Sequence, residues 1–243
     1  MWKNEFEIID FHSHILPGMD DGAEDISASV AMLSELLSQG VDKVLATSHY
    51  YEFREDISSY LSRREEALFK LESHIKEHDI YLPEIVPAAE VRLYHGMWQD
   101  ENISRLTVAD SKYILLEMPY DYWTDWMFSE VYSLMSRGYI PIMAHLERYI
   151  DIVPEKEIEQ KLLPLGVLVQ CNAESFESRS AKKFMKKLLK SGRLTVLGTD
   201  CHDMTDRPPH IKGALDYISK KFGDDKISYI MKNAGIIISG NNN

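Results

Sequence analysis

The chain has 243 residues, of which 44% are hydrophobic and 27% are charged. This length suits one large α/β domain, because α/β barrels commonly run about 200–250 residues as a single unit. The formal net charge of -12 argues against a nucleic-acid-binding surface, because such surfaces gain most of their affinity by neutralising phosphates. We therefore expect a single domain over residues 1–240, a frayed tail at 241–243 and no nucleic-acid partner.

Three features bear on location. Cys171 and Cys201 are the only cysteines, too few for the disulfide framework of a small secreted protein. The first residues lack the charged-then-apolar pattern of a secretion signal. The longest apolar stretch, near 162–169, is interrupted by Pro164 and Gly166 and is too short to span a membrane. We expect a cytoplasmic protein without membrane insertion, and the sequence leaves its oligomeric state open.

Strand-like and helix-like segments alternate from end to end. We expect strands at residues 7–11, 41–47, 81–91, 112–117, 140–144, 165–171 and 194–199. The expected helices are residues 25–39, 56–78, 97–105, 125–137, 155–163, 180–190, 209–221 and 225–232. Seven such units in sequence favour a parallel sheet closed into a barrel, with a doubly wound open sheet as the alternative.

Side chains of His, Asp and Glu stand where six of the apolar runs stop. They are His12 with His14, His49, Glu90, Glu117, His145, and Asp200 with His202. Strands of an α/β barrel deliver functional side chains at their C-terminal ends, so these residues should meet at one mouth. Carboxylates mixed with imidazoles favour Mn, Fe or Zn, with Mg also possible. The set exceeds the needs of one ion, so we expect two or three divalent ions.

Two motifs alternate as strand residues do. His12 and His14 should share one face of a strand, which lets both imidazoles approach one ion, although two hydrogen-bonded core histidines would give the same pattern. Asp200 and His202 share a face in the same way, while Cys201 points elsewhere.

Acids and arginines lie near these motifs. Asp20 and Asp21 precede Gly22, and this pattern marks a turn that can fold back over the mouth. Arg148 follows His145 closely, and Arg207 begins a proline-rich turn. Guanidinium groups suit phosphate oxygens, although surface ion pairs would also account for them. A centre of several cations with arginines at its rim indicates hydrolysis of a phosphate ester by a metal-activated hydroxide.

Taken together, these motifs resemble the polymerase and histidinol phosphatase (PHP) family. More narrowly, they resemble the bacterial manganese-dependent protein tyrosine phosphatases of capsular and exopolysaccharide biosynthesis. The residues that carry the resemblance are His12-Ser13-His14, Asp20-Asp21-Gly22, Thr47-Ser48-His49, Ala89-Glu90, Leu116-Glu117, His145-Leu146-Glu147-Arg148-Tyr149, Asp200-Cys201-His202 and Arg207-Pro208-Pro209-His210. The resemblance covers nearly the whole chain and implies a distorted (β/α)7 TIM-like barrel, the PHP fold, with three metals.

The resemblance also implies a role for each residue. The first metal is held by His12, His14, Glu90 and Asp200, the second by Glu90, Glu117 and His145 with Glu90 bridging, and the third by Asp21, His49 and His202. Arg148 and Arg207 grip the phosphoryl group, and Arg92 reaches the substrate. The aromatic segments 50–51 and 119–123 would pack on a phosphotyrosine ring. The implied substrate is the tail of a tyrosine kinase of polysaccharide export.

Four alternatives remain. The same centre would serve a small-molecule phosphatase of the histidinol-phosphate type, a nuclease, or a non-catalytic metal-dependent phosphopeptide-binding module. The fourth is a thiol mechanism, because Cys201 and Arg207 have the Cys-x5-Arg spacing. Asp203 and Asp206 in that interval argue against it, since their carboxylates would repel phosphate and raise the thiol pKa.

Overall fold

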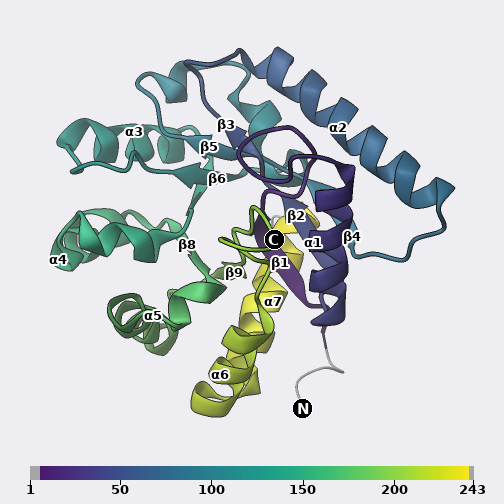
Figure 1. The fold of residues 1–243 in the computed structure, drawn as a ribbon. Coiled ribbons are helices and arrows are strands. Elements are labelled where there is room, and N and C mark those ends of the chain that lie inside the picture. The colour runs from purple at the N-terminus through teal and green to yellow at the C-terminus, as the bar shows by residue number, and fades with distance from the viewer. Residues whose placement is uncertain (1–5, 241–243) are drawn as a thin grey trace.

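A computed structural model describes residues 6–240, and the expected tail at 241–243 lies outside them. Parallel strands form an inner curved sheet, and helices pack around its outer face (Figure 1). The strands are β1 (Ile9–Ser13), β2 (Lys43–Ala46), β3 (His49–Tyr50), β4 (Glu84–Pro87), β5 (Glu90–Arg92), β6 (Tyr113–Glu117), β7 (Ile140–Met143), β8 (Leu168–Asn172) and β9 (Val196–Gly198). The α-helices are α1 (Ile26–Ser38), α2 (Ile57–Glu77), α3 (Asp125–Ser136), α4 (Glu155–Glu157), α5 (Arg179–Ser191), α6 (Lys212–Phe222) and α7 (Asp224–Ile238).

The strands lie in two ladders that together make one barrel. Their orders are β1-β2-β4 and β3-β5-β6-β7-β8-β9. Two residues separate β2 from β3 and β4 from β5, so the second and third strands of the barrel are each interrupted in mid-course. The ring closes where Ser13 bridges Cys201 and the Asp200 N–H donates to the His12 carbonyl at 2.6 Å. The expected barrel is confirmed, and the open-sheet alternative is wrong.

Several expected elements differ in detail. Residues 81–91 form two strands, because the Glu90 N–H turns to the carbonyls of Thr47 and Ser48 at 3.2 Å each. Residues 97–105, expected as a helix, form the 3-10 turns η1 (Met97–Gln99) and η2 (Ile103–Leu106). The helix expected at 155–163 is the short α4 followed by a π turn, η5 (Ile158–Leu162). Helix α7 runs beyond residue 232, because Ala234 and Ile237 continue its buried face.

Local chemistry fixes the helix ends and faces. The Asp25 carboxylate caps α1 by accepting from the Ala28 N–H at 2.8 Å. Met32, Leu33 and Leu36 form the buried stripe of the same helix. Gly192 ends α5 in the left-handed conformation with φ of 69°. Among the described residues, no helix is both long and apolar enough to cross a membrane.

Gly198 lets β9 and β1 approach closely at the point where the ring closes. A Cβ there would lie 2.5 Å from the His12 Cβ and 2.6 Å from the His12 backbone nitrogen. Gly198→Ala should therefore lower the free energy of unfolding by about 1–3 kcal/mol, the usual cost of overpacking. Gly213→Ala on α6 is the matched control, because its Cβ would meet nothing within 4 Å. Urea denaturation measures both, and a G198A midpoint equal to that of G213A would contradict this account.

Candidate metal centre

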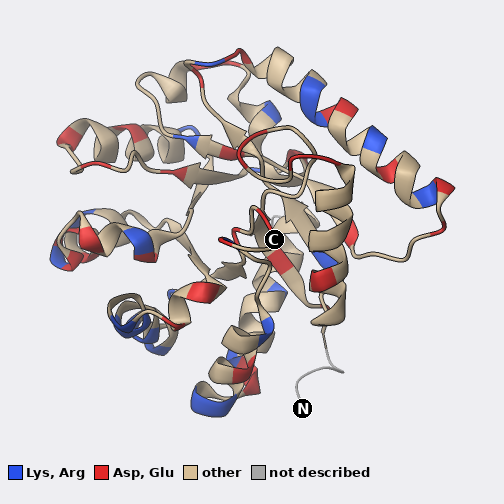
Figure 2. Cartoon of the chain, in the orientation of Figure 1, with Lys and Arg blue, Asp and Glu red and all other residues tan. Residues whose placement is uncertain are grey.

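The nine expected ligands come together at the carboxyl ends of the strands. They are His12, His14, Asp21, His49, Glu90, Glu117, His145, Asp200 and His202. His12, His14 and Glu90 are fully buried, whereas the Asp21 side chain is 67% exposed. Figure 2 shows Asp and Glu on loops over the middle of the barrel and much of the Lys and Arg on outer helices such as α2 and α5. The cluster thus runs from the barrel interior to its surface.

Four ligand atoms surround one point inside the barrel. The His12 Nε2 lies 3.3 Å from the Glu90 Oε2 and 3.4 Å from the Asp200 Oδ1. The His14 Nε2 lies 3.4 Å and 3.3 Å from the same two oxygens. Atoms that share one divalent ion at about 2.1 Å are expected about 3.0–3.4 Å apart for octahedral or tetrahedral angles. The spacing therefore suits a single ion.

A second group of side chains, around Glu90 and Glu117, adjoins this point. The His145 Nε2 lies 2.8 Å from the Glu90 Oε1 and 4.0 Å from the Glu117 Oε1. The His49 Nδ1 lies 2.9 Å from the Glu90 Oε2 and 4.0 Å from the Glu117 Oε2. Glu90 thus belongs to both the first and the second group, as a bridging carboxylate must.

The third group lies nearest the solvent. The Asp21 Oδ1 is 3.6 Å from the His49 Nε2 and 3.5 Å from the His202 Nε2. The geometry differs in two respects from the ligand sets implied by resemblance. His14 also lies within reach of this third group, and His49 also lies within reach of Glu90 and Glu117.

Unpaired buried atoms show that the cluster suits cations. Within residues 6–240, the Glu90 Oε2, Glu117 Oε2, Asp200 Oδ1, His49 Nδ1 and His202 Nε2 are buried and have no hydrogen-bond partner. Buried polar atoms in native proteins are normally paired, and buried charges either form pairs or bind metals. Carboxylate oxygens and imidazole nitrogens that converge without hydrogen bonds therefore fit divalent ions.

The structure separates the roles of Asp20 and Asp21. The Asp20 Oδ2 lies 2.8 Å from the His14 Nδ1 and accepts from the His49 N–H at 2.8 Å. This contact directs the His14 Nε2 towards the centre, as acidic partners of metal-binding histidines commonly do. Asp21 faces His49 and His202, and the nearby His202 imidazole lowers the pKa of its carboxyl to about 2. The geometry favours Asp21 as the ligand and Asp20 as the support of His14.

Arg148 and Arg207 converge on one oxygen at the rim. The Arg148 Nη1 lies 2.7 Å and the Arg207 Nη2 2.8 Å from the Asp200 Oδ2. Arg92 lies elsewhere, with its guanidinium carbon 5.7 Å from the centre of the Tyr51 ring. The Tyr51 ring in turn stacks on His49 at 4.9 Å. Arg92 therefore belongs to an aromatic wall beside the centre, separate from the arginine pair.

The expected aromatic segments are only partly accessible. Tyr50 and Trp123 are buried in the core and are not free to contact a substrate. Tyr120 is 68% exposed, and its ring centre lies 6.2 Å from that of Tyr149. Of the aromatic residues expected to contact a ring, Tyr51, Tyr120 and Tyr122 remain candidates, and the Tyr122 side chain is 55% exposed.

The thiol alternative fails on burial. Cys201 is fully buried, and burial together with the nearby Asp10 carboxylate raises the pKa of its thiol well above the usual value. Reactive cysteines need a stabilised thiolate and some access. Cys201 has neither.

Sequence reasoning missed three buried polar residues around the centre: Asp10, Gln170 and Asn172. Asp10 accepts from the Thr199 N–H at 2.8 Å and the Thr199 hydroxyl at 2.6 Å, and burial raises the pKa of its carboxyl to about 6. Gln170 and Asn172 alternate at the end of β8, so their polar character inside an apolar run was the available signal.

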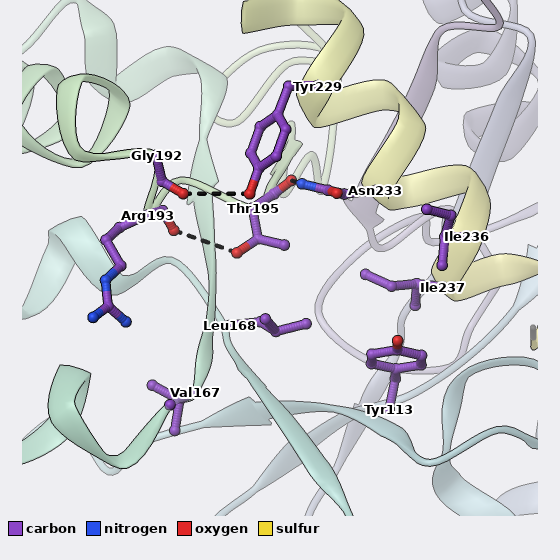
Figure 3. Close-up of a pocket in the computed structure, with 11 residues that line it drawn as sticks. Tyr113, Val167, Leu168, Gly192, Arg193, Thr195, Tyr229, Asn233, Ile236 and Ile237 are labelled. Carbon is purple, nitrogen blue, oxygen red and sulfur yellow. Dashed lines mark hydrogen bonds between the residues drawn. The ribbon is translucent and has the colours of Figure 1, made fainter. Parts of the chain in front are cut away.

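A pocket at the opposite end of the strands offers no comparable chemistry (Figure 3). It lies between α7 and the first residues of the strands, and Leu168 and Thr195 line it. The Asn233 amide there donates to the Thr195 carbonyl at 3.2 Å. Arg193 is its one ionisable group other than the tyrosines.

A barrel that gathers imidazoles and carboxylates at the carboxyl ends of its strands defines the class of metal-dependent hydrolases. Residues 8–239 match the family described as "Capsular polysaccharide synthesis, CpsB/CapC", and the chain belongs to that family. The expected relationship to the tyrosine phosphatases of capsule synthesis is thereby confirmed.

Individual relatives match over almost the whole chain. The Bacillus subtilis protein named tyrosine-protein phosphatase YwqE is 30% identical over 237 residues, covering 95% of this chain and 91% of that protein. The Streptococcus pneumoniae tyrosine-protein phosphatase CpsB is 28% identical over 241 residues, covering 90% of this chain and 93% of that protein. A crystal structure from work on YwqE and CpsB, called "unique metal-dependent tyrosine phosphatases", gives a TM-score of 0.82 at 29% identity and covers 96% of this chain and 95% of that chain.

Added metal should stabilise this protein. A ligand that binds only the folded state adds about 2.7 kcal/mol at 100 times its dissociation constant, so Mn²⁺ should raise the melting temperature above that measured with a chelator. Glu90→Gln should remove most of this rise, because Glu90 contacts every imidazole of the inner groups. Glu66→Gln on the exposed face of α2 is the control. If Mn²⁺ did not change the melting temperature of the wild-type protein, the conclusion that this cluster binds cations would be contradicted.

Proposed function

We propose that this chain is a metal-dependent phosphatase that hydrolyses phosphotyrosine in proteins, with residues 1–240 acting as one catalytic domain. The main support is that Arg148 and Arg207 both contact one oxygen of Asp200, whose other oxygen lies among the buried imidazoles. Phosphate-binding groups and a cation-binding cluster thus share one carboxylate. The names of the relatives support the same activity.

The proposed cofactor is two or three divalent ions, of which manganese is our choice. His12, His14, Glu90 and Asp200 would hold the first, Glu90, Glu117 and His145 the second, and Asp21, His49 and His202 the third. Such ions supply Lewis-acid charge and lower the pKa of a bound water. Hard oxygens mixed with imidazole nitrogens support manganese, iron or zinc over a thiolate-bound structural metal.

Two arginines, Arg148 and Arg207, would hold the phosphoryl group of the substrate next to the metal ions. Asp200 anchors two guanidinium groups at 2.7 and 2.8 Å, so both are oriented before a substrate arrives. Their remaining N–H groups can donate to phosphoryl oxygens, where charge accumulates as the ester breaks. The Arg148 Nη2 also reaches Glu174 at 3.2 Å, which fixes the plane of its fork. Preorganised donors of this kind stabilise the transition state more than the ground state.

We propose that Tyr51 and Tyr120 contact the aryl ring of phosphotyrosine and that Arg92 takes part through Tyr51. Aromatic pairs contribute about 0.5–1.5 kcal/mol beyond the area they bury, enough to favour an aryl ester over an alkyl one. The proposed partner is the tyrosine-rich tail of a polysaccharide-export kinase, and the family description supports a setting in capsular polysaccharide synthesis. The free thiols of Cys171 and Cys201 support a cytoplasmic site of action.

The main test compares substrates and metal. With Mn²⁺, the full chain should hydrolyse a phosphotyrosine peptide, and a chelator should abolish the activity. Cys201→Ser should retain it, because the buried thiol takes no part. Release of phosphate measures each reaction. Equal or faster turnover of histidinol phosphate would instead identify a small-molecule phosphatase, and metal-dependent peptide binding without phosphate release would identify a binding module.

Arg148→Ala should reduce kcat by about 100-fold or more, the usual cost of removing one transition-state donor. R148A should still bind Mn²⁺ at saturating metal, because Arg207 continues to hold the outer oxygen of Asp200. Arg193→Ala, at the other end of the barrel, is the matched control. Steady-state kinetics and metal titration check both effects. Unchanged kcat in R148A would rule out its proposed role.

A further inference from the structure

One strand of the barrel delivers no proposed metal ligand. Strand β8 lies between β7, which precedes His145, and β9, which precedes Asp200. At its end, Gln170 and Asn172 are both fully buried and alternate along the strand, so they face the same side. Buried amides persist only with hydrogen-bond partners. Their partners are the ligands on either side.

The orientation of the Gln170 amide follows from its contacts. The Gln170 Oε1 lies 2.5 Å from the His145 backbone N–H, which can only donate. The oxygen must therefore face His145. The same oxygen lies 3.1 Å from the His12 Nδ1, so that nitrogen must carry the proton. In the neutral imidazole this leaves the lone pair on the His12 Nε2, the atom that lies 3.3 Å from Glu90 and 3.4 Å from Asp200.

The chain of amides continues to Asp200. The Gln170 Nε2 donates to the Asn172 Oδ1 at 2.9 Å, and the Asn172 Nδ2 donates to the Asp200 Oδ2 at 2.8 Å. Reversing the Asn172 amide would place two acceptors together at Asp200 and two donors together at Gln170. Each link thus fixes the direction of the next. The Asp200 Oδ2 accepts these hydrogen bonds, whereas the Oδ1 has no hydrogen-bond partner and lies among the imidazoles.

We propose that Gln170 and Asn172 are positioning residues of the metal centre. Their directional hydrogen bonds run from the His145 backbone to Asp200, set the tautomer of His12 and aim one Asp200 oxygen inward. The inference rests on the metal-binding part of the proposed function. Partners of metal ligands typically contribute about 10–100-fold in metal affinity. Gln170 is expected to have the larger effect, because it contacts His12, His145 and Asn172.

Gln170→Met and Asn172→Leu remove the amides at similar size. Titration of the metal-free full chain with Mn²⁺ should give dissociation constants about 10–100-fold weaker than wild type. Asn233→Leu is the control, because this amide donates to a backbone carbonyl but lies at the opposite end of the barrel (Figure 3). Its Mn²⁺ affinity should stay within about twofold of wild type, as expected for an independent site. Melting of the metal-free variants measures any loss of packing separately.

Gln170→Glu separates positioning from packing. It keeps an acceptor oxygen opposite both His145 and His12, so it should bind Mn²⁺ more tightly than Q170M despite the added buried charge. A purely structural role predicts the reverse order. The Q170M/N172L double variant should bind about as weakly as the weaker single variant, because the two residues act as one chain.

Two results would overturn the inference: wild-type Mn²⁺ affinity in both Q170M and N172L, or weaker binding by Q170E than by Q170M. These readouts involve no substrate. If the wild-type protein binds Mn²⁺ with the expected variant order but releases no phosphate, the catalytic proposal fails and this inference stands.

Discussion

The centre depends on one buried carboxylate. Glu90 is fully buried, and imidazole nitrogens of His12, His14, His49 and His145 lie within 2.8–3.4 Å of its oxygens. Burial alone would favour the neutral acid, but His12 and His49 hold the pKa of the Glu90 carboxyl well below its usual range. A buried charge persists only where the surrounding structure compensates it. The interruption between β4 and β5 therefore matters to the centre, because it places Glu90 beside these imidazoles.

The backbone is strained at two of the proposed metal ligands. His145 has a φ of 32° and Asp200 a φ of 55°, values that residues other than glycine seldom adopt. Such strain persists where neighbouring contacts over-determine it. The His145 N–H donates to Gln170, and the Asp200 N–H donates to the His12 carbonyl. Each strained residue is thus held by a hydrogen bond from its own backbone N–H.

Much of this arrangement could be predicted from the sequence. Proposed ligands such as Glu90 and Glu117 follow apolar runs directly, and the carboxyl ends of parallel strands meet at one mouth. The choice between Asp20 and Asp21 could not be made, because adjacent acids in a turn differ only in where the turn points them. The interrupted third strand depends on the contact of the Glu90 N–H with residues 47 and 48, more than forty positions earlier. Gln170 gave little signal, because a strand-end amide gains meaning only from its neighbours in space.

The exposure of Asp21 has a consequence for how the protein would respond to its surroundings. Most ligands of the inner groups are sealed from water, whereas Asp21 stands two-thirds open at the edge of the outer group. An ion bound there would exchange with the medium more readily than one enclosed by the barrel. Scarcity of the metal would empty this outer position first and leave the folded interior intact.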